Sequence, residues 1–280
     1  MKIGFVGAGK AGFSLGKYFV EHDFKVSGYY SRNIASAEEA GAFTQTCCYE
    51  KPEDIVRESD VLFLTVPDGK IHEVYQEIRR MDIAGKCICH CSGALSSRVF
   101  SDIREQGAYG YSVHPVCAIN DKKKGWQELS GAYFTIEGDR QYLGKLQEMI
   151  QSLGNPVELI TPEVKPKYHL AAVFASNLVE GLYDQAAELM MECGLSEEFA
   201  RGALVPLFLE NAKNIGKHGV EQALTGPVER ADADTIERHL QAVQGDTREI
   251  YRLLSRQLVE IAKRKNPGRE YDKISEMLEE

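Results

Sequence analysis

The first dozen residues constrain the fold of this chain more than any other stretch. Residues 2–12 read KIGFVGAGKAG, so a short apolar segment runs into glycines at 7, 9 and 12 with the spacing G-x-G-x-x-G. In a dinucleotide-binding strand–turn–helix, the first glycine permits the tight turn and the second lets a pyrophosphate approach the backbone. The third lets the helix pack closely on the strand, and the helix N-terminus favours phosphate.

A glycine turn without a ligand is the alternative, and the surrounding residues decide against it. Ala11, Leu15 and Tyr18 recur at helical spacing after the turn, and a second strand pattern follows over 25–30. This is the spacing of a strand–helix–strand unit. We therefore expect the turn to contact a dinucleotide through Gly7, Ala8, Gly9, Lys10, Ala11 and Gly12.

Strand and helix patterns alternate up to about residue 160. The pattern predicts strands over 3–6, 25–30, 61–66, 87–91, 109–113, 132–136 and 157–160, with a weak strand near 44–48. It predicts helices over 11–22, 35–40, 52–58, 71–81, 97–106 and 141–152. This alternation is typical of an α/β Rossmann domain, in which a doubly wound, mostly parallel sheet carries helices on both faces.

Strand patterns disappear after residue 160, which predicts an all-α C-terminal domain. A long helical pattern covers 167–193, and further helices are expected over 196–216, 232–243 and 247–263. From residue 265 the chain is charged, which indicates a frayed end or one terminal helix. The predicted domains are 1–160, binding the dinucleotide, and 161–280, serving dimerisation and substrate binding.

The residues that follow the strands indicate which nucleotide is bound, because ligands lie at the carboxyl ends of parallel strands. An NAD site usually has a carboxylate about 20 residues after the glycines, but here the chain reads Ser31-Arg32-Asn33. A hydroxyl and a guanidinium suit a 2′-phosphate, although an exposed surface arginine is the alternative. This favours NADP.

Three later strand ends supply polar residues. Val66, Pro67 and Asp68 follow the strand at 61–66 and are expected beside the cofactor ribose, although Asp68 equally suits a helix N-cap. Ser92 and Gly93 follow the strand at 87–91, and His114 follows the strand at 109–113. Ser92 could instead cap the next helix, and His114 could be a packed histidine. Their position predicts the place where nicotinamide and substrate meet.

Charge and cysteine usage exclude several classes of protein. With 33 basic and 42 acidic residues the net charge is −9, which disfavours nucleic acid and anionic membranes as partners. The N-terminus enters a strand directly, so no signal peptide is expected, and seven cysteines indicate reduced thiols in a cytoplasmic protein. Cys87, Cys89 and Cys91 alternate along one strand, which favours a buried strand over a metal site.

Taken together, these motifs identify a family. The chain resembles Rossmann-like oxidoreductases with a C-terminal helical domain of unknown function, relatives of pyrroline-5-carboxylate reductase, prephenate dehydrogenase and the 6-phosphogluconate and β-hydroxyacid dehydrogenases. The resemblance rests on the glycine turn, Tyr30-Ser31-Arg32, Val66-Pro67-Asp68, His90-Cys91-Ser92-Gly93, His114-Pro115, Tyr168-His169, Ser176-Asn177 and Ala223-Leu224-Thr225-Gly226-Pro227. Family members usually read Arg-Gly-Asp where this chain has Arg230-Ala231-Asp232. The resemblance implies an NADP domain, a homodimer through the C-terminal helices and a cleft between the domains.

We therefore expect an NADP-dependent oxidoreductase that transfers hydride to or from a small carbonyl, imine or hydroxyl compound. His169 is the expected acid/base, because imidazole exchanges protons near neutral pH. Ser92 and Ser176 are expected to hydrogen-bond the reacting group, with Asn177 positioning it and His114 on the same rim. The alternative is a non-catalytic NADP-binding sensor, while a methyltransferase is disfavoured by Ser31 and Arg32.

Overall fold

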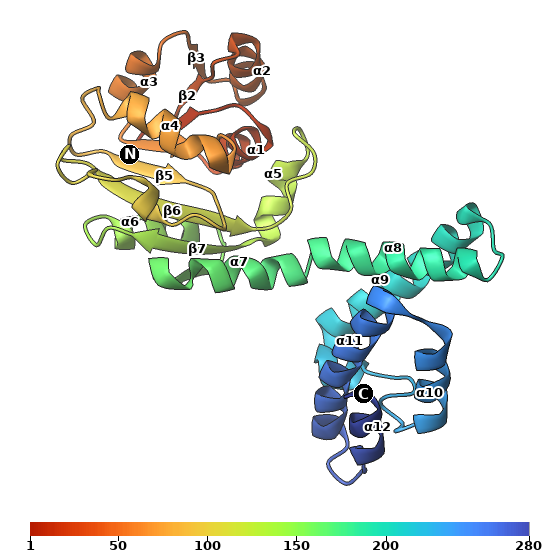
Figure 1. Cartoon of the computed structure of the whole chain (residues 1–280). Helices are drawn as coiled ribbons and strands as arrows, with labels where there is room; N and C mark the ends of the chain where they lie inside the picture. Colours follow the sequence, from red (N-terminus) through yellow and green to blue (C-terminus); the bar gives the residue numbers. More distant parts are fainter. Residues whose placement is uncertain (280) are drawn as a thin grey trace. The chain divides into compact units, whose positions relative to one another are not determined.

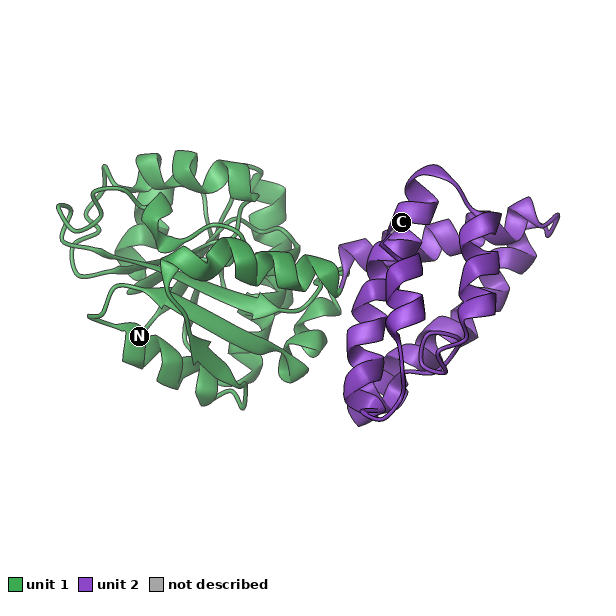
Figure 2. Cartoon of the chain, turned by 60° about the horizontal axis from the view of Figure 1, so that its bottom comes forward, with its two compact units in different colours: residues 1–175 green, residues 176–280 purple. Residues whose placement is uncertain are grey.

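The computed structural model describes residues 1–279 and divides the chain into two compact units, the first ending at Ala175 and the second beginning at Ser176 (Figure 2). The boundary expected from the sequence was residue 160. The first unit extends further because helix α7 (Lys165–Phe174) packs onto the sheet, where Lys165 and Tyr168 contact residues of strand β6 (Tyr109–Val116).

An eight-stranded sheet forms the centre of unit 1 (Figure 1). Its strand order is β3-β2-β1-β4-β5-β6-β7-β8. The other strands are β1 (Ile3–Val6), β2 (Val26–Tyr30), β3 (Cys47–Tyr49), β4 (Val61–Leu64), β5 (Cys87–His90), β7 (Tyr133–Gly138) and β8 (Val157–Leu159). Only the β6–β7 pair is antiparallel among these strands. The predicted Rossmann fold is confirmed, and the strand order reverses between β1 and β4, where such sheets bind ligands.

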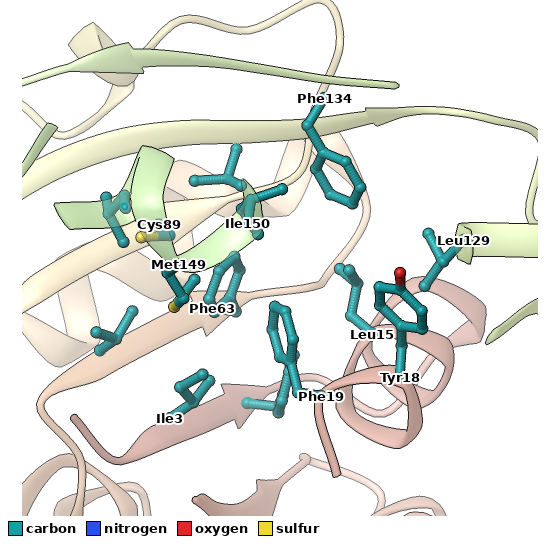
Figure 3. Close-up of a cluster of buried hydrophobic side chains, with 14 of the residues drawn as sticks. Ile3, Leu15, Tyr18, Phe19, Phe63, Cys89, Leu129, Phe134, Met149 and Ile150 are labelled. Atoms are coloured by element: carbon teal, nitrogen blue, oxygen red, sulfur yellow. The ribbon is translucent and has the colours of Figure 1, made fainter. Parts of the chain in front are cut away.

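Helices cover both faces of this sheet. Phe5, Phe63 and Phe134 bury one face against helices α1 (Lys10–Glu21), α2 (Ile34–Thr44) and α6 (Leu143–Gln151), as Figure 3 shows for α1 and α6. Leu62 and Ile88 bury the other face against α3 (Pro52–Glu58) and α4 (Asp68–Ile78). A short helix α5 (Gly125–Glu128) precedes β7. The central strands are therefore apolar on both faces, as parallel strands require.

Cys87 and Cys89 of β5, and Cys91 directly after it, behave as the alternation predicted. Cys87 and Cys89 are buried in the first of these cores, and Cys91 packs against it. Burial raises the pKa of Cys87 and of Cys91 to about 12. These thiols are therefore apolar packing groups that stay protonated.

Two predictions for unit 1 were wrong. The helix expected over 97–106 is a single 3₁₀ turn (Ser97–Val99), and Asp102 then adopts a left-handed φ of 59° that ends any helical run. Strand β6 does not stop before His114 but runs to Val116, because the antiparallel strand β7 pairs with its last residues. His114 therefore lies within a strand, opposite Thr135.

Unit 2 is helical, as predicted. It contains α8 (Asn177–Glu192), α9 (Glu197–Ala223), α10 (Ala233–Ala242), α11 (Gly245–Lys265) and α12 (Asp272–Met277). The single helix expected over 167–193 was wrong: it is interrupted between α7 and α8 at Ser176, whose φ and ψ are −133° and −88°. Serine and asparagine side chains compete for backbone hydrogen bonds and favour such breaks. No helix within residues 1–279 is long and apolar enough to cross a membrane.

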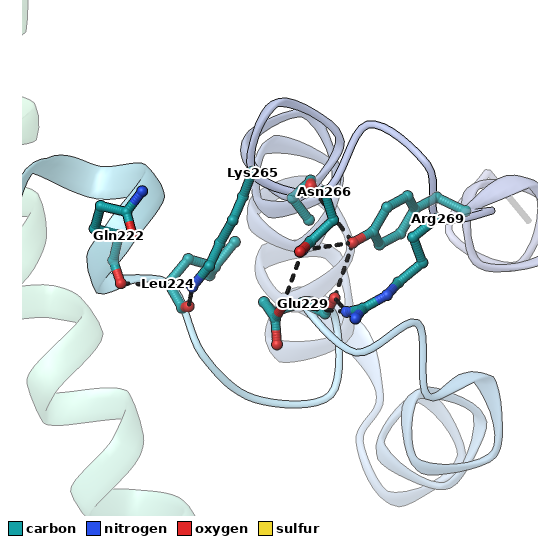
Figure 4. Close-up of polar contacts among 8 residues, drawn as sticks. Gln222, Leu224, Glu229, Lys265, Asn266 and Arg269 are labelled. Carbon is teal, nitrogen blue, oxygen red and sulfur yellow. Dashed lines mark hydrogen bonds and ion pairs between the residues drawn. The ribbon is translucent and has the colours of Figure 1, made fainter.

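The end of α11 holds the loop that follows α9 (Figure 4). Lys265 Nζ donates to the Leu224 carbonyl at 2.7 Å, and Asn266 Nδ2 donates to Glu229 Oε1 at 2.9 Å. Further along this loop, Ala231 has a φ of 58°, in the left-handed region that favours glycine. In the family that the chain resembles, this position is usually the glycine of the Arg-Gly-Asp sequence. These contacts give residues 224–231 a structural role in unit 2.

Candidate functional site

The glycine turn has the geometry that a dinucleotide site needs. Gly7 adopts a φ of 111°, and a Cβ there would lie 2.7 Å from the Thr65 carbonyl oxygen. A Cβ on Gly12 would overlap Thr65 Oγ1 and lie 2.6 Å from the Gly7 oxygen. By contrast, a Cβ on Gly9 would find its nearest neighbour, the Thr65 oxygen, 3.9 Å away. The protein itself requires Gly7 and Gly12, whereas Gly9 borders open space.

That space belongs to a hollow of about 320 Å³ at the ends of β1, β2 and β4. Of the predicted cofactor residues, the hollow is lined by Gly7, Ala8, Gly9, Ser31, Arg32, Asn33, Val66 and Pro67. The predicted residues outside its lining are Lys10, Ala11, Gly12, Asp68, Ser92 and Gly93. The hollow is near the lower end of the range for small-molecule sites, and thus suits part of a dinucleotide.

Arg32 lines this hollow and forms an ion pair with Glu73. Its Nη1 is 3.3 Å from Glu73 Oε1, and its side chain is 63% exposed. Glu73 also accepts a 2.6 Å hydrogen bond from Lys70, which is the main reason that the pKa of Glu73 is lowered. Glu73 would therefore stay paired with Lys70 if the Arg32 side chain turned away from it.

A second polar cluster lies at the ends of β4 and β5. Ser92 Oγ donates to Asp68 Oδ2 at 2.6 Å and accepts from the Leu95 N–H at 2.9 Å. Ser92 thus caps the turn after β5, which is the structural role that the sequence left open, although the expected helix is missing. Pro67 rather than Asp68 occupies the N-cap position of α4, and Asp68 is the first residue of the helix. Its position is fixed by Ser92.

His114 is half-buried beside Tyr168 of α7. Tyr168 Oη lies 2.6 Å from His114 Nδ1, and the two rings meet edge to face. Burial, assisted by the nearby Lys165, His169 and His90, lowers the pKa of His114 to about 3. The imidazole is therefore neutral at physiological pH.

His169 and His114 approach the same glycine. A Cβ on Gly93 would lie 2.8 Å from His114 Nε2 and 2.9 Å from His169 Nδ1. Within residues 1–279, His169 Nδ1 is buried without a hydrogen-bond partner. The structure thus brings Ser92, Gly93, His114 and His169 together within unit 1.

Sequence reasoning missed Lys165, which lies beneath this cluster. Its side chain is 1% exposed, and its ammonium donates 2.8 Å hydrogen bonds to the Ser92 carbonyl and to Ser112 Oγ. Burial lowers the pKa of Lys165 to about 8. No carboxylate of the described chain forms an ion pair with it. A lysine between Val164 and Pro166 carries no sequence signal that distinguishes it from a surface residue.

Glu137 of β7 was missed as well. Its carboxylate is 1% exposed and accepts from the Ser97 N–H at 2.6 Å and from Ser97 Oγ at 2.7 Å. The pair fixes the segment that leads away from Ser92 and Gly93. The sequence carried no signal for it, because the strand predicted over 132–136 ended one residue before Glu137.

Two predicted site residues are not part of this cluster as described. Ser176 and Asn177 begin unit 2, where Ser176 Oγ lies 3.3 Å from Asn177 Oδ1. Their contact with a substrate stays a prediction.

These features define a class: a Rossmann-like domain joined to a helical unit. Comparison with protein families supports both parts. Residues 1–115 match the family model of the Rossmann-like domain, and residues 132–258 match that of a domain of unknown function, DUF2520. The clustered residues come from both matches, since His114 lies in the first and Lys165, Tyr168 and His169 lie in the second.

Solved structures share this architecture over nearly the whole chain. Protein TM1727 from Thermotoga maritima is 28% identical, with a TM-score of 0.76 over 94% of this chain and 99% of its own. A provisionally named NADP oxidoreductase from Bacteroides fragilis is 24% identical, with a TM-score of 0.67 over 92% and 98%. A reductive aminase from Aspergillus terreus, in complex with NADPH and ethyl-5-oxohexanoate, is 17% identical, with a TM-score of 0.65 over 99% of both chains. A search of curated proteins finds no match.

Proposed function

We propose that this protein is an NADP-dependent oxidoreductase acting on a small carbonyl, imine or hydroxyl compound. The observation that carries the proposal is the hollow beside the glycine turn, which Ser31 and Arg32 line where an NAD site usually has a carboxylate. The structures of a provisionally named NADP oxidoreductase and of a reductive aminase with NADPH, which share the fold, support the same class.

The residues at the hollow fit the parts of NADP. Backbone N–H groups at Gly9 and the start of α1 would receive the pyrophosphate, because a Cβ-free surface and a helix N-terminus meet there. Arg32 and Ser31 would hold the 2′-phosphate through charge-assisted hydrogen bonds. Val66 and Pro67 form an apolar wall. Bound NADPH would supply a hydride to the substrate.

The cluster around Gly93 supplies the remaining chemistry. Reduction of a carbonyl or imine needs a proton as well as a hydride, and a histidine within hydrogen-bond reach is suited to give it. His169 is the candidate acid/base, since its buried Nδ1 has no protein partner among the described residues. His114 also approaches Gly93. Ser92 orders the turn that contains Gly93 by accepting a hydrogen bond from the Leu95 N–H.

Calorimetric titration with NADP and NAD tests the proposal. Wild-type protein should bind NADP more tightly, by roughly tenfold, because a hydrogen bond to a charged group contributes about 1.5–3 kcal/mol. Arg32→Ala should remove this preference, whereas Arg57→Ala, an equally exposed arginine of the same unit, should keep it. Equal affinity of the wild type for both nucleotides would exclude an NADP-specific site, and binding without turnover of any carbonyl, imine or alcohol would favour the sensor.

A further inference from the structure

Two residues of α7 act on His114: Tyr168 contacts the ring, and Lys165 acts on it through its charge. We infer that Tyr168 and Lys165 hold His114 as a neutral donor whose Nε2–H binds a substrate atom with a free lone pair, so the site takes a carbonyl compound rather than a protonated imine. The protonation state of His114 follows from contacts within unit 1. The class of substrate also rests on the proposed function.

Tyr168 sets the tautomer of the imidazole. Its hydroxyl lies 2.6 Å from His114 Nδ1, so one of the two groups must donate to the other. A phenol is the stronger donor and a neutral imidazole nitrogen the stronger acceptor, and burial raises the pKa of Tyr168, so the phenol keeps its proton. Tyr168 therefore donates to Nδ1. The one proton of the neutral ring is then on Nε2.

Lys165 keeps the ring neutral. The titratable groups near His114 are Lys165, Tyr168 and His169 of α7 and His90 of β5, and none of them is an acid that would favour a second proton on the ring. On β7 the residue opposite His114 is Thr135, which is uncharged. The ammonium of Lys165 is fixed by the Ser92 carbonyl and Ser112 Oγ, two residues before His114 along β6. A charge held there opposes protonation of the imidazole.

The direction of the Nε2–H determines what can bind. His114 Nε2 faces Gly93, on the same side as His169 Nδ1. A carbonyl oxygen there would accept from Nε2–H with its lone pair. A protonated imine has no lone pair, so its own N–H would meet the histidine N–H, and its charge would lie near Lys165. Sites built for one hydrogen-bond pattern reject the opposite pattern strongly.

The proposed reduction balances with groups already named. The carbonyl carbon gains the hydride of NADPH, and its second bond to oxygen becomes a lone pair. The oxygen then takes a proton from His169, which leaves an alcohol and NADP⁺. Throughout, His114 keeps its own proton and contributes a hydrogen bond only.

Proton-detected ¹⁵N spectra of histidine-labelled protein test the state of His114 without any substrate. Loss of one signal set in His114→Gln assigns the ring. We expect an unprotonated Nδ1, a protonated Nε2 and no titration of the ring across the physiological pH range. Tyr168→Phe should mix the tautomers and Lys165→Met should raise the pKa of the ring, while the exposed controls Tyr133→Phe and Lys167→Met should change neither. A wild-type ring that is protonated on Nδ1, or that titrates near its ordinary pKa, overturns the inference.

Binding of two matched probes tests the class of substrate. Saturation-transfer spectra with NADP present compare cyclopentanone with 2-methyl-1-pyrroline, at a pH where the imine is protonated. We expect the ketone to bind at least about tenfold more tightly, and NADPH oxidation to follow the same order. Tighter binding of the imine, or no binding of the ketone, overturns the assignment of a carbonyl substrate. Failure of NADPH itself to bind in calorimetry would instead reject the proposed function and leave the tautomer result standing.

Discussion

At the scale of single residues, two glycines of the turn are expected to serve different purposes: Gly12 is needed for folding and Gly9 for binding. Gly12→Ala should destabilise unit 1 by about 1–3 kcal/mol, because the added methyl group would overlap Thr65 and the Gly7 oxygen in a packed interior. Gly9→Ala should leave stability nearly unchanged and weaken NADP binding, because its nearest protein atom is 3.9 Å away and only a ligand would meet the methyl. Urea denaturation and calorimetric titration of both variants distinguish the two effects. A stable Gly12→Ala protein would contradict the packing argument.

Two histidines with lowered pKa values make stability depend on pH. Burial lowers the pKa of His90 to about 4 and that of His114 to about 3, so below pH 6.5 the unfolded chain binds protons that the folded chain does not. Their contribution is fully present above pH 6.5 and is lost as the pH falls towards these values. Below pH 6.5, His114→Gln should reduce the slope of the free energy of unfolding against pH by about 1.4 kcal/mol per pH unit. The substitution His218→Gln, at an exposed position, should leave this slope unchanged. Denaturation midpoints measured from neutral to mildly acid pH test this prediction. If the wild type and His114→Gln lost stability in parallel as the pH falls, His114 would not cause the pH dependence.

Single residues also show where sequence reasoning stops. The glycine spacing fixes Gly7, Gly9 and Gly12 through local backbone geometry, and the structure gives Gly7 and Gly12 their expected packing. Lys165 depends instead on contacts with residues 53 and 73 positions earlier in the chain. No local pattern reports such a contact, and an isolated lysine is usually exposed.

At the scale of elements, the segment after β5 depends on β7. Glu137 accepts two hydrogen bonds from Ser97, and both residues flank the cluster around Gly93. Glu137→Gln should cost about 1–3 kcal/mol, because an amide presents a donor where the carboxylate accepts and leaves a buried group unpaired. It should also loosen the segment 92–97, which amide hydrogen exchange would report. Glu158→Gln on β8, an exposed position, serves as the control, and equal stability of the two variants would contradict this role.

Elements with strong periodicity were predictable and the interrupted ones were not. The apolar strands of the sheet and the helices that pack on them follow from alternation and helical spacing. The break at Ser176 was missed because residues on both sides keep helical spacing. The extension of β6 to Val116 was missed because the partner strand β7 decides it, and that pairing is not local.

At the scale of the whole molecule, unit 2 leaves much apolar surface uncovered within one chain. Only Ala200 is buried among the 27 residues of α9, although the helix carries several large apolar side chains. Leu207 is 68% exposed, and Leu253 of α11 is 56% exposed. Stable monomers rarely expose large apolar patches, and an amphipathic helix needs a partner for its apolar residues. We propose that a second copy of this chain covers them.

Sedimentation at micromolar concentration tests this homodimer. Wild-type protein should sediment at twice the 31.3 kDa mass of the chain. Leu207→Glu combined with Leu253→Glu should give monomers that keep their helical content, because the charges would be buried without partners only in the assembly. Tyr133→Glu in unit 1, where the side chain is 64% exposed, should leave assembly unchanged. A wild-type monomer would contradict the homodimer, and a double variant that still dimerises would show that the dimer forms through another surface.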